Sequence, residues 1–237
     1  DNFKEVITIF QDKNNNYWMG TDQKGIFIIN DKLSYAFSLQ EKNKWDINIP
    51  AVSLNDIKII EGDYWLATDN GVFIVSDSYK ITKHLPKKNK VIGLLSNKIS
   101  AIEQTGDDKV WLAGENGLNR VNLLDYSIEE FQKNAYPSSL SENWLNDIYK
   151  DSSGRLWLGT YSNGLNIYNP SPQVFHHTYK NNFTVESFAE TNSGSIWLST
   201  QQDRLYKFTN NIITEEFIPQ INTGILQLFS NNSNLLW

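Results

Sequence analysis

Several features that define common protein classes are missing from this sequence of 237 residues. It contains no cysteine, which excludes disulfide bonds and thiolate metal sites within it. No apolar run approaches the roughly 20 residues of a membrane-spanning helix. Lys and Arg number 21 against 27 Asp and Glu, and the net charge of -6 disfavours nucleic acid as a partner, since phosphate neutralisation needs a basic surface. With 40% hydrophobic residues, the sequence predicts a globular fold.

Tryptophan, by contrast, is abundant and regularly spaced. Six of the eight tryptophans recur at intervals of 47, 46, 46, 40 and 40 residues, at Trp18, Trp65, Trp111, Trp157, Trp197 and Trp237. The first five lie in similar words: YWMGT, YWLAT, VWLAG, LWLGT and IWLST. A repeat of this length is typical of proteins built from stacked identical units.

Each unit is predicted to contain four short β-strands, because its residues alternate and are separated by turn residues. In the first unit the predicted strands are 6–10, 17–21, 25–29 and 35–39, and later first strands are predicted at 57–60, 99–103, 145–149 and 185–189. The Asn-Gly pairs within 69–71, 115–117 and 162–164 predict two-residue hairpin turns with positive φ at both residues. Helix is not expected as a main element.

The sequence therefore predicts an all-β fold, a β-propeller made of four-stranded antiparallel blades. Complete blades are expected at about 4–40, 53–86, 97–133, 144–180 and 183–218, followed by a partial blade at 224–237. The recurring tryptophans are expected to pack between blades. Because the sixth unit is incomplete, we expect a fragment of a larger, seven-bladed propeller.

The fourth unit, DIYKDSSGRLWLGTYSNGLNIYNP at 147–170, resembles the two-component regulator propeller repeat. That resemblance implies a periplasmic sensor region of a membrane-bound hybrid histidine kinase of the Bacteroidetes type, a class that responds to products of polysaccharide breakdown. It implies an extracytoplasmic, non-enzymatic module that senses glycan-derived oligosaccharides. The implied partners are the remainder of the receptor chain and a second receptor copy in a homodimer. A protein–protein interaction platform without a small-molecule ligand is the alternative function.

Catalysis and metal binding are not expected. The virginiamycin lyases are propellers with a comparable repeat, but they need a histidine near the propeller axis. Here His84, His176 and His177 fall near predicted fourth strands. Asp12, Asn14 and Asn16 have the spacing of a calcium loop, yet an Asn-rich hairpin turn explains the same residues. No cofactor is expected.

If a ligand binds, the loops that connect second to third strands and one blade to the next are the expected place. Two tryptophans outside the repeat, Trp45 and Trp144, lie in the longer blade connections. Sugar rings stack on exposed aromatic rings, and amides and carboxylates bind their hydroxyl groups. The candidate ligand-binding residues are therefore Trp45, Asn70, Glu115, Asn116, Trp144, Tyr161 and Asn163. The alternative is that these loop aromatics pack on their own blades.

Overall fold

The computed structural model describes residues 6–21, 25–29, 36–38, 49, 52–87, 93–106, 108–170, 173–179, 183–202, 204–210, 212–217 and 228. Within these residues all regular structure is β, and the elements are five sheets of four antiparallel strands. The strands of the first two sheets are β1 (Val6–Gln11), β2 (Tyr17–Thr21), β3 (Gly25–Ile29), β4 (Ala36–Ser38), β5 (Leu54–Ile60), β6 (Asp63–Thr68), β7 (Gly71–Val75) and β8 (Ile81–Leu85). The third and fourth sheets contain β9 (Ile99–Thr105), β10 (Lys109–Gly114), β11 (Gly117–Asn122), β12 (Ile128–Phe131), β13 (Leu145–Lys150), β14 (Leu156–Thr160), β15 (Leu165–Pro170) and β16 (Gln173–Tyr179). The fifth contains β17 (Val185–Glu190), β18 (Ile196–Thr200), β19 (Leu205–Thr209) and β20 (Ile212–Phe217).

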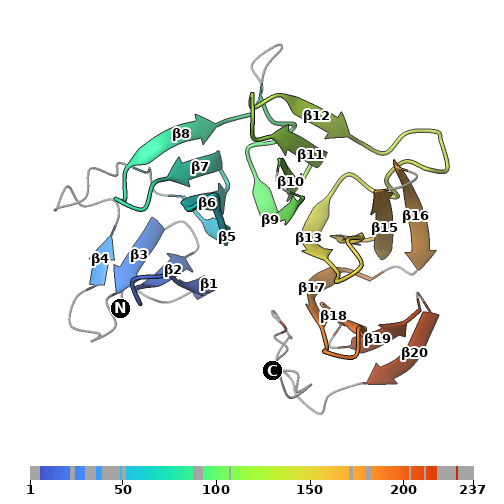
Figure 1. Ribbon diagram of the computed structural model, residues 1–237. Helices are drawn as coiled ribbons and strands as arrows, with labels where there is room; N and C mark the ends of the chain where they lie inside the picture. Colours follow the sequence, from blue (N-terminus) through green and yellow to red (C-terminus); the bar gives the residue numbers. More distant parts are fainter. Residues whose placement is uncertain are drawn as a thin grey trace. The chain divides into compact units, whose positions relative to one another are not determined.

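Each sheet is a meander in which consecutive strands are neighbours, as Figure 1 shows. Such sheets in tandem are the blades of a β-propeller, so the predicted fold class is confirmed. We number the blades 1 to 5 in chain order. The chain divides into two compact units, Asp1–Ile102 and Glu103–Trp237. Blades 1 and 2 lie in the first unit, blades 4 and 5 lie in the second, and the boundary falls within β9.

The Asn-Gly turns differ from the prediction. Only the glycine has a positive φ, at 86° for Gly71, 124° for Gly117 and 70° for Gly164, whereas the preceding asparagines do not. The two residues before the glycine form the turn, and the glycine takes the left-handed conformation that follows it. At Gly71 a side chain is also excluded by space, because an added Cβ would lie 2.2 Å from the carbonyl oxygen of Leu85.

One first strand, that of blade 2, begins earlier than predicted, at a bulge; the other four begin at the predicted residues. In blade 2 the strand starts at Leu54 rather than Ile57, and the pairing with β6 shifts register between Leu54 and Asp56. The polar pair Asn55 and Asp56 resembles a turn in the sequence, but it forms the bulge. Asp56 Oδ1 accepts the following backbone N–H of Ile57 at 2.7 Å, which stabilises that geometry.

This bulge pair also binds the first strand of the following blade. Asn55 Nδ2 donates to the carbonyl of Ile99 at 2.7 Å, and Asp56 Oδ2 accepts the N–H of Ile102 at 2.8 Å. The side chains thus satisfy backbone groups on the free edge of β9, which would otherwise be buried without partners.

Blade 4 repeats the arrangement with the pair Asn146 and Asp147. Asn146 Nδ2 donates to the carbonyl of Val185, and Asp147 Oδ2 accepts the N–H of Phe188 at 3.1 Å. In blade 5 the equivalent hydroxyl, Ser187 Oγ, accepts the N–H of Leu228 at 2.9 Å. Leu228 therefore occupies the register of Phe188, and the other residues of the partial blade expected at 224–237 lie outside the described residues.

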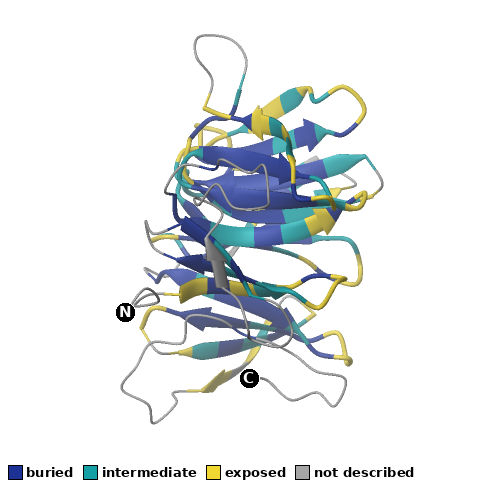
Figure 2. Cartoon of the chain, turned by 90° about the vertical axis from the view of Figure 1, so that its left-hand side faces the viewer, coloured by how far each residue is buried: buried dark blue, intermediate teal, exposed yellow. Residues whose placement is uncertain are grey.

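The recurring tryptophans pack on the next blade. In the first unit the Trp18 ring packs on Tyr64 of blade 2, and the two ring centroids lie 4.7 Å apart. In the second unit Trp157 contacts Phe208 of blade 5 edge to face, with centroids 5.5 Å apart. Trp157 is 1% exposed, whereas Trp197 at the same position of blade 5 is only half-buried. Figure 2 shows the burial concentrated in the strands, and the exposure in turns and edges.

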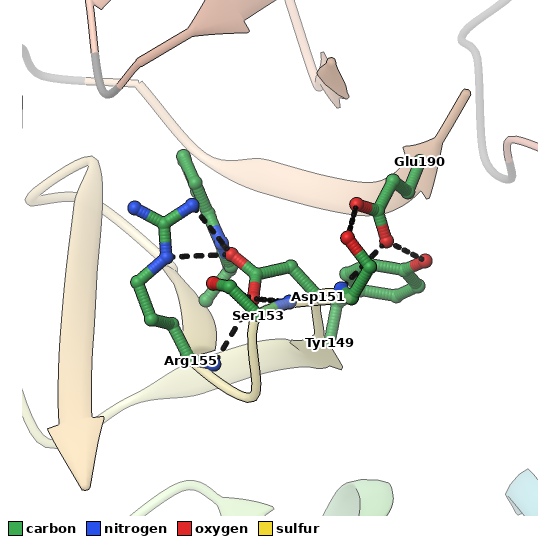
Figure 3. Close-up of polar contacts among 7 residues, drawn as sticks. Tyr149, Asp151, Ser153, Arg155 and Glu190 are labelled. Atoms are coloured by element: carbon green, nitrogen blue, oxygen red, sulfur yellow. Dashed lines mark hydrogen bonds and ion pairs between the residues drawn. The ribbon is translucent and has the colours of Figure 1, made fainter. Parts of the chain in front are cut away.

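A buried aspartate supports the tryptophan in two blades. In blade 4 the indole N–H of Trp157 donates to Asp151 Oδ2 at 2.8 Å. The same carboxylate accepts hydrogen bonds from Ser153 and forms an ion pair of 2.7 Å with Arg155 (Figure 3). Although burial raises the pKa of a carboxyl, the hydrogen bonds from Ser153, Trp157 and Arg155 outweigh it and lower the pKa of Asp151.

Asp12 performs the same task in blade 1, which favours the hairpin interpretation of the calcium-like spacing. Its Oδ1 accepts the backbone N–H groups of Asn14 and Asn16, each at 2.8 Å. Its Oδ2 accepts the indole N–H of Trp18 at 3.0 Å and the hydroxyl of Tyr79 at 2.8 Å. The carboxylate therefore closes the turn and joins it to blade 2.

We expect unfolding stability to fall at alkaline pH through Tyr149. Burial, followed by the charge of Glu190, raises the pKa of its phenol, whose hydroxyl donates to Glu190 at 3.3 Å (Figure 3). The folded pKa lies above the unfolded value of about 10, so this stabilisation is present below pH 10 and lost as pH rises. Urea unfolding from pH 8 to 11 should show a shallower decline for Tyr149→Phe than for the wild type. The exposed Tyr136→Phe serves as control and should follow the wild type; equal slopes for all three proteins would contradict the prediction.

Candidate functional site

Two aromatic side chains stack at one end of blade 4. Trp144 precedes β13, and Tyr161 opens the turn between β14 and β15. Their ring centroids lie 4.3 Å apart with an angle of 14° between the planes. The backbone N–H of Tyr161 donates to the carbonyl of Trp144 at 3.0 Å, which holds the two segments together. Because Tyr161 is 42% exposed, the stacked pair leaves aromatic surface open to solvent. We call this pair the aromatic platform.

The turn beside the platform is anchored by Glu142. Its Oε2 accepts the backbone N–H of Ser162 at 2.8 Å and that of Asn163 at 3.1 Å. Its Oε1 accepts the hydroxyl of Ser162 at 2.8 Å. A carboxylate at the exposed rim of the platform is thereby fixed in position by three hydrogen bonds.

Further contacts make this end of the blade rigid. The hydroxyl of Thr160 donates to the carbonyl of Gly164 at 2.9 Å and accepts the N–H of Asn163 at 2.9 Å, so the turn is closed from within. Asn163 Nδ2 makes a long contact of 3.5 Å with the carbonyl of Ser141. The hydroxyl of Thr184, at the start of blade 5, donates to the carbonyl of Tyr161. The platform is therefore tied to two blades of the second unit.

The structure brings together three of the predicted residues, Trp144, Tyr161 and Asn163. Three others lie on different turns. Asn70 belongs to the first unit, where its N–H donates to Thr68 and its carbonyl contacts His84. Glu115 and Asn116 form the turn between β10 and β11. Trp45 lies outside the described residues, and the binding role of all seven residues stays a prediction.

Sequence reasoning did not single out Glu142 or Thr184. Both lie within three residues of a first strand, in the connection that enters a blade. Glu142 stands two residues before the non-repeat Trp144, and this proximity was the available signal. Its partners, Ser162 and Asn163, are 20 and 21 residues away, a pairing that only the fold reveals.

Two of the three histidines make contacts at fourth strands. His84 in β8 lies 2.7 Å from the carbonyl of Asn70 through Nε2 and stacks on Phe73 with centroids 4.1 Å apart. His177 in β16 lies 2.8 Å from the carbonyl of Ser139 through Nε2. Among the residues that the structure describes, no group of three or more His, Asp or Glu side chains is arranged to hold a metal ion. The same residues include no helix long and apolar enough to span a membrane.

Comparison of the solved structures relates the chain to sensor propellers. One similar structure is the extracellular domain assigned to a hybrid two component system of B. thetaiotaomicron, with a TM-score of 0.75 and 21% identity over 98% of this chain and 30% of that one. A second such domain from the same organism gives a TM-score of 0.70 and 24% identity over 98% of this chain and 32% of that one. The chain thus spans about a third of the length of these domains. At these identities the likeness establishes the fold.

An enzyme shares the fold as well. Catalytically inactive virginiamycin B lyase from Staphylococcus aureus, solved with quinupristin, gives a TM-score of 0.71 and 19% identity over 94% of this chain and 74% of that one. A search of the curated proteins finds no match. The family model of the two component regulator propeller matches residues 2–23 and 139–162, which hold parts of blades 1 and 4. The chain is a β-propeller that contains two-component regulator propeller repeats.

Proposed function

We propose that this chain is a non-enzymatic, extracytoplasmic ligand-sensing module of a two-component receptor of the hybrid histidine kinase type. The matched regulator propeller repeats carry this proposal. Support comes from the similar folds of two extracellular domains assigned to hybrid two component systems. The remainder of the receptor chain and a second receptor copy are its partners, and ligand occupancy changes how the two copies associate.

The ligand class that the aromatic platform fits is a glycan-derived oligosaccharide. Trp144 and Tyr161 offer a flat apolar surface, and the hydroxyl of Tyr161 makes no hydrogen bond within the described residues. Asn163 and Glu142 supply polar atoms beside the rings. Proteins hold sugar rings by stacking the apolar face on an aromatic ring and binding hydroxyls with amides and carboxylates.

Removing one ring of the platform should weaken this binding strongly. We expect Trp144→Ala to weaken oligosaccharide binding at least about tenfold, because both the stacking surface and the support of Tyr161 are lost. Isothermal titration calorimetry of the chain against a panel of neutral and acidic oligosaccharides measures the effect. The matched control is Tyr136→Ala, an aromatic that is 74% exposed in the same blade connection and outside the stack. Equal affinity of Trp144→Ala and the wild type would contradict a role of the platform.

One observation favours the alternative, a protein interaction platform without a small-molecule ligand. On β1, Ile9 is 57% exposed, whereas Ile57 at the same position of β5 is 4% exposed because blade 1 covers it. The face of β1 thus has the chemistry of a blade interface, and the partner that it fits is a separate protein with an apolar sheet face. Binding of a separate protein that slows hydrogen exchange of β1 amides in this chain, with no hit in the oligosaccharide panel, would establish this function instead.

A further inference from the structure

The charge at the rim of the aromatic platform restricts which sugars can bind. We propose that the platform accepts an uncharged sugar unit, and that Glu142 selects against units that carry a carboxylate or a sulfate. This inference rests on the proposed oligosaccharide-sensing function and names the ligand class of the same site.

The position of Glu142 is the first support. Both of its oxygens are fixed to the turn that carries Tyr161, through the N–H groups of Ser162 and Asn163 and the hydroxyl of Ser162. The carboxylate cannot turn away from a ligand on the platform without breaking these three bonds. Its charge therefore belongs to the site.

The second support is that the described residues of the platform and its anchors carry no compensating cation. Residues 139–144, 161–164 and 183–184, which build the platform and its anchors, include no Lys or Arg. Within the described part of the chain Glu142 forms no ion pair, and Arg204 on the neighbouring turn is paired with Glu216. An anionic group brought next to Glu142 would meet a like charge at short range.

Glu142 can still assist a neutral sugar. An ionised carboxylate has about four acceptor positions, and three of those of Glu142 are filled by Ser162 and Asn163. The remaining position can accept a hydrogen bond that a hydroxyl group of the neutral sugar donates. The same group that repels an acid therefore orients an uncharged unit.

The cation that could oppose this selectivity is Lys133, at the start of the same blade connection. Its backbone N–H donates to Asn143 Oδ1 at 2.7 Å, so the two ends of the connection lie close together. The competing hypothesis is that Lys133 binds anionic sugars, and the variant Lys133→Ala tests it.

The test compares neutral oligosaccharides with their C6-oxidised uronate forms, by calorimetry on the 237-residue chain at low salt. We expect the neutral member of each pair to bind at least about tenfold more tightly than its uronate form. This difference in affinity, the gap, should be smaller in about 0.5 M salt. In Glu142→Gln, which keeps an acceptor for the turn, neutral affinity should fall because the sugar hydroxyl loses an ionised acceptor, while the difference in affinity between neutral and uronate forms narrows. Thermal unfolding of this variant checks that the turn remains folded.

Three results would overturn the inference. Tighter binding of uronate forms, lost in Lys133→Ala, would assign the site to acidic sugars. An unchanged gap in Glu142→Gln would show that another group sets the selectivity. Loss of all binding in folded Glu142→Gln, equal to that of Trp144→Ala, would make Glu142 a positioning residue only. Absence of binding by every sugar to the wild type is a different result, since it would remove the proposed function itself.

Discussion

Trp157→Ala is expected to lower the free energy of unfolding by about 3–5 kcal/mol, the usual effect of truncating a fully buried tryptophan. The ring is 1% exposed and lies in an apolar cluster with Phe208 and Tyr206 of blade 5. Its removal leaves a cavity between two blades. It also removes the indole N–H that donates a hydrogen bond to Asp151. Because domains are commonly stable by only about 5–15 kcal/mol, the variant should unfold at a much lower urea concentration.

The repeat itself supplies a matched control for this experiment. Trp197 has the same position in blade 5 but is half-buried, so Trp197→Ala should cost less than half as much. Urea unfolding followed by far-UV circular dichroism compares the two variants. Equal losses would contradict the view that the tryptophan stabilises the contact with the next blade. Trp157→Phe, which keeps a ring and loses the N–H, separates the apolar contribution from the hydrogen bond.

The fold could be predicted from the sequence because its determinants are local and repeated. A tryptophan word flanked by turn residues specifies a four-stranded blade, and five copies leave little freedom in register. The bulges were not visible in advance. Asn55 and Asp56 looked like turn residues, but the structure uses their side chains to bind β9, a contact 44 to 46 residues away.

The turns were mispredicted for a related reason. An Asn-Gly pair suits a hairpin with positive φ at both positions, yet in blades 2 and 4 the side chain of the preceding threonine stabilises another geometry. The hydroxyl of Thr68 donates to the carbonyl of Gly71 at 2.8 Å and accepts the N–H of Asn70 at 3.0 Å. Thr160 does the same in blade 4. In these two blades a threonine at the strand end, three or four residues before the glycine, was therefore the sequence signal for this turn geometry.

The candidate site was predictable only in part. Trp144 stood out because it breaks the period, and Tyr161 because it is an aromatic in a predicted loop between a second and a third strand. Their stacking could not be read from the sequence, since 17 residues separate them and the intervening strands set the distance. Asn70, Glu115 and Asn116 were chosen by analogy of turns, but an analogous turn in another blade does not bring a side chain to the same place.

Asp151→Ala should be the second large loss, and it tests whether a buried carboxylate organises blade 4. Asp151 is 3% exposed, and its oxygens accept from Ser153, Arg155 and Trp157 at distances of 2.6 to 3.0 Å. Without the carboxylate, the guanidinium of Arg155 and the indole N–H lack their acceptor. Breaking a fully buried pair costs about 3–5 kcal/mol. Because the Arg155 side chain is 29% exposed and regains water, we expect about 2–4 kcal/mol here.

Two further variants make the Asp151 experiment decisive. Asp125 accepts the N–H of Ser127 at 2.9 Å in an exposed turn, so Asp125→Ala should change stability little and serves as the matched control. Adding Arg155→Met to Asp151→Ala should recover part of the loss, because it removes the unpaired cation.

The pKa of Asp151 lies below its ordinary value in the folded state. Its contribution is therefore present above about pH 4 and lost as pH falls, so the gap between wild type and Asp151→Ala should narrow in acid. A gap that stays constant from pH 7 to 2.5 would mean that the lost packing, and not the charge of Asp151, destabilises the variant.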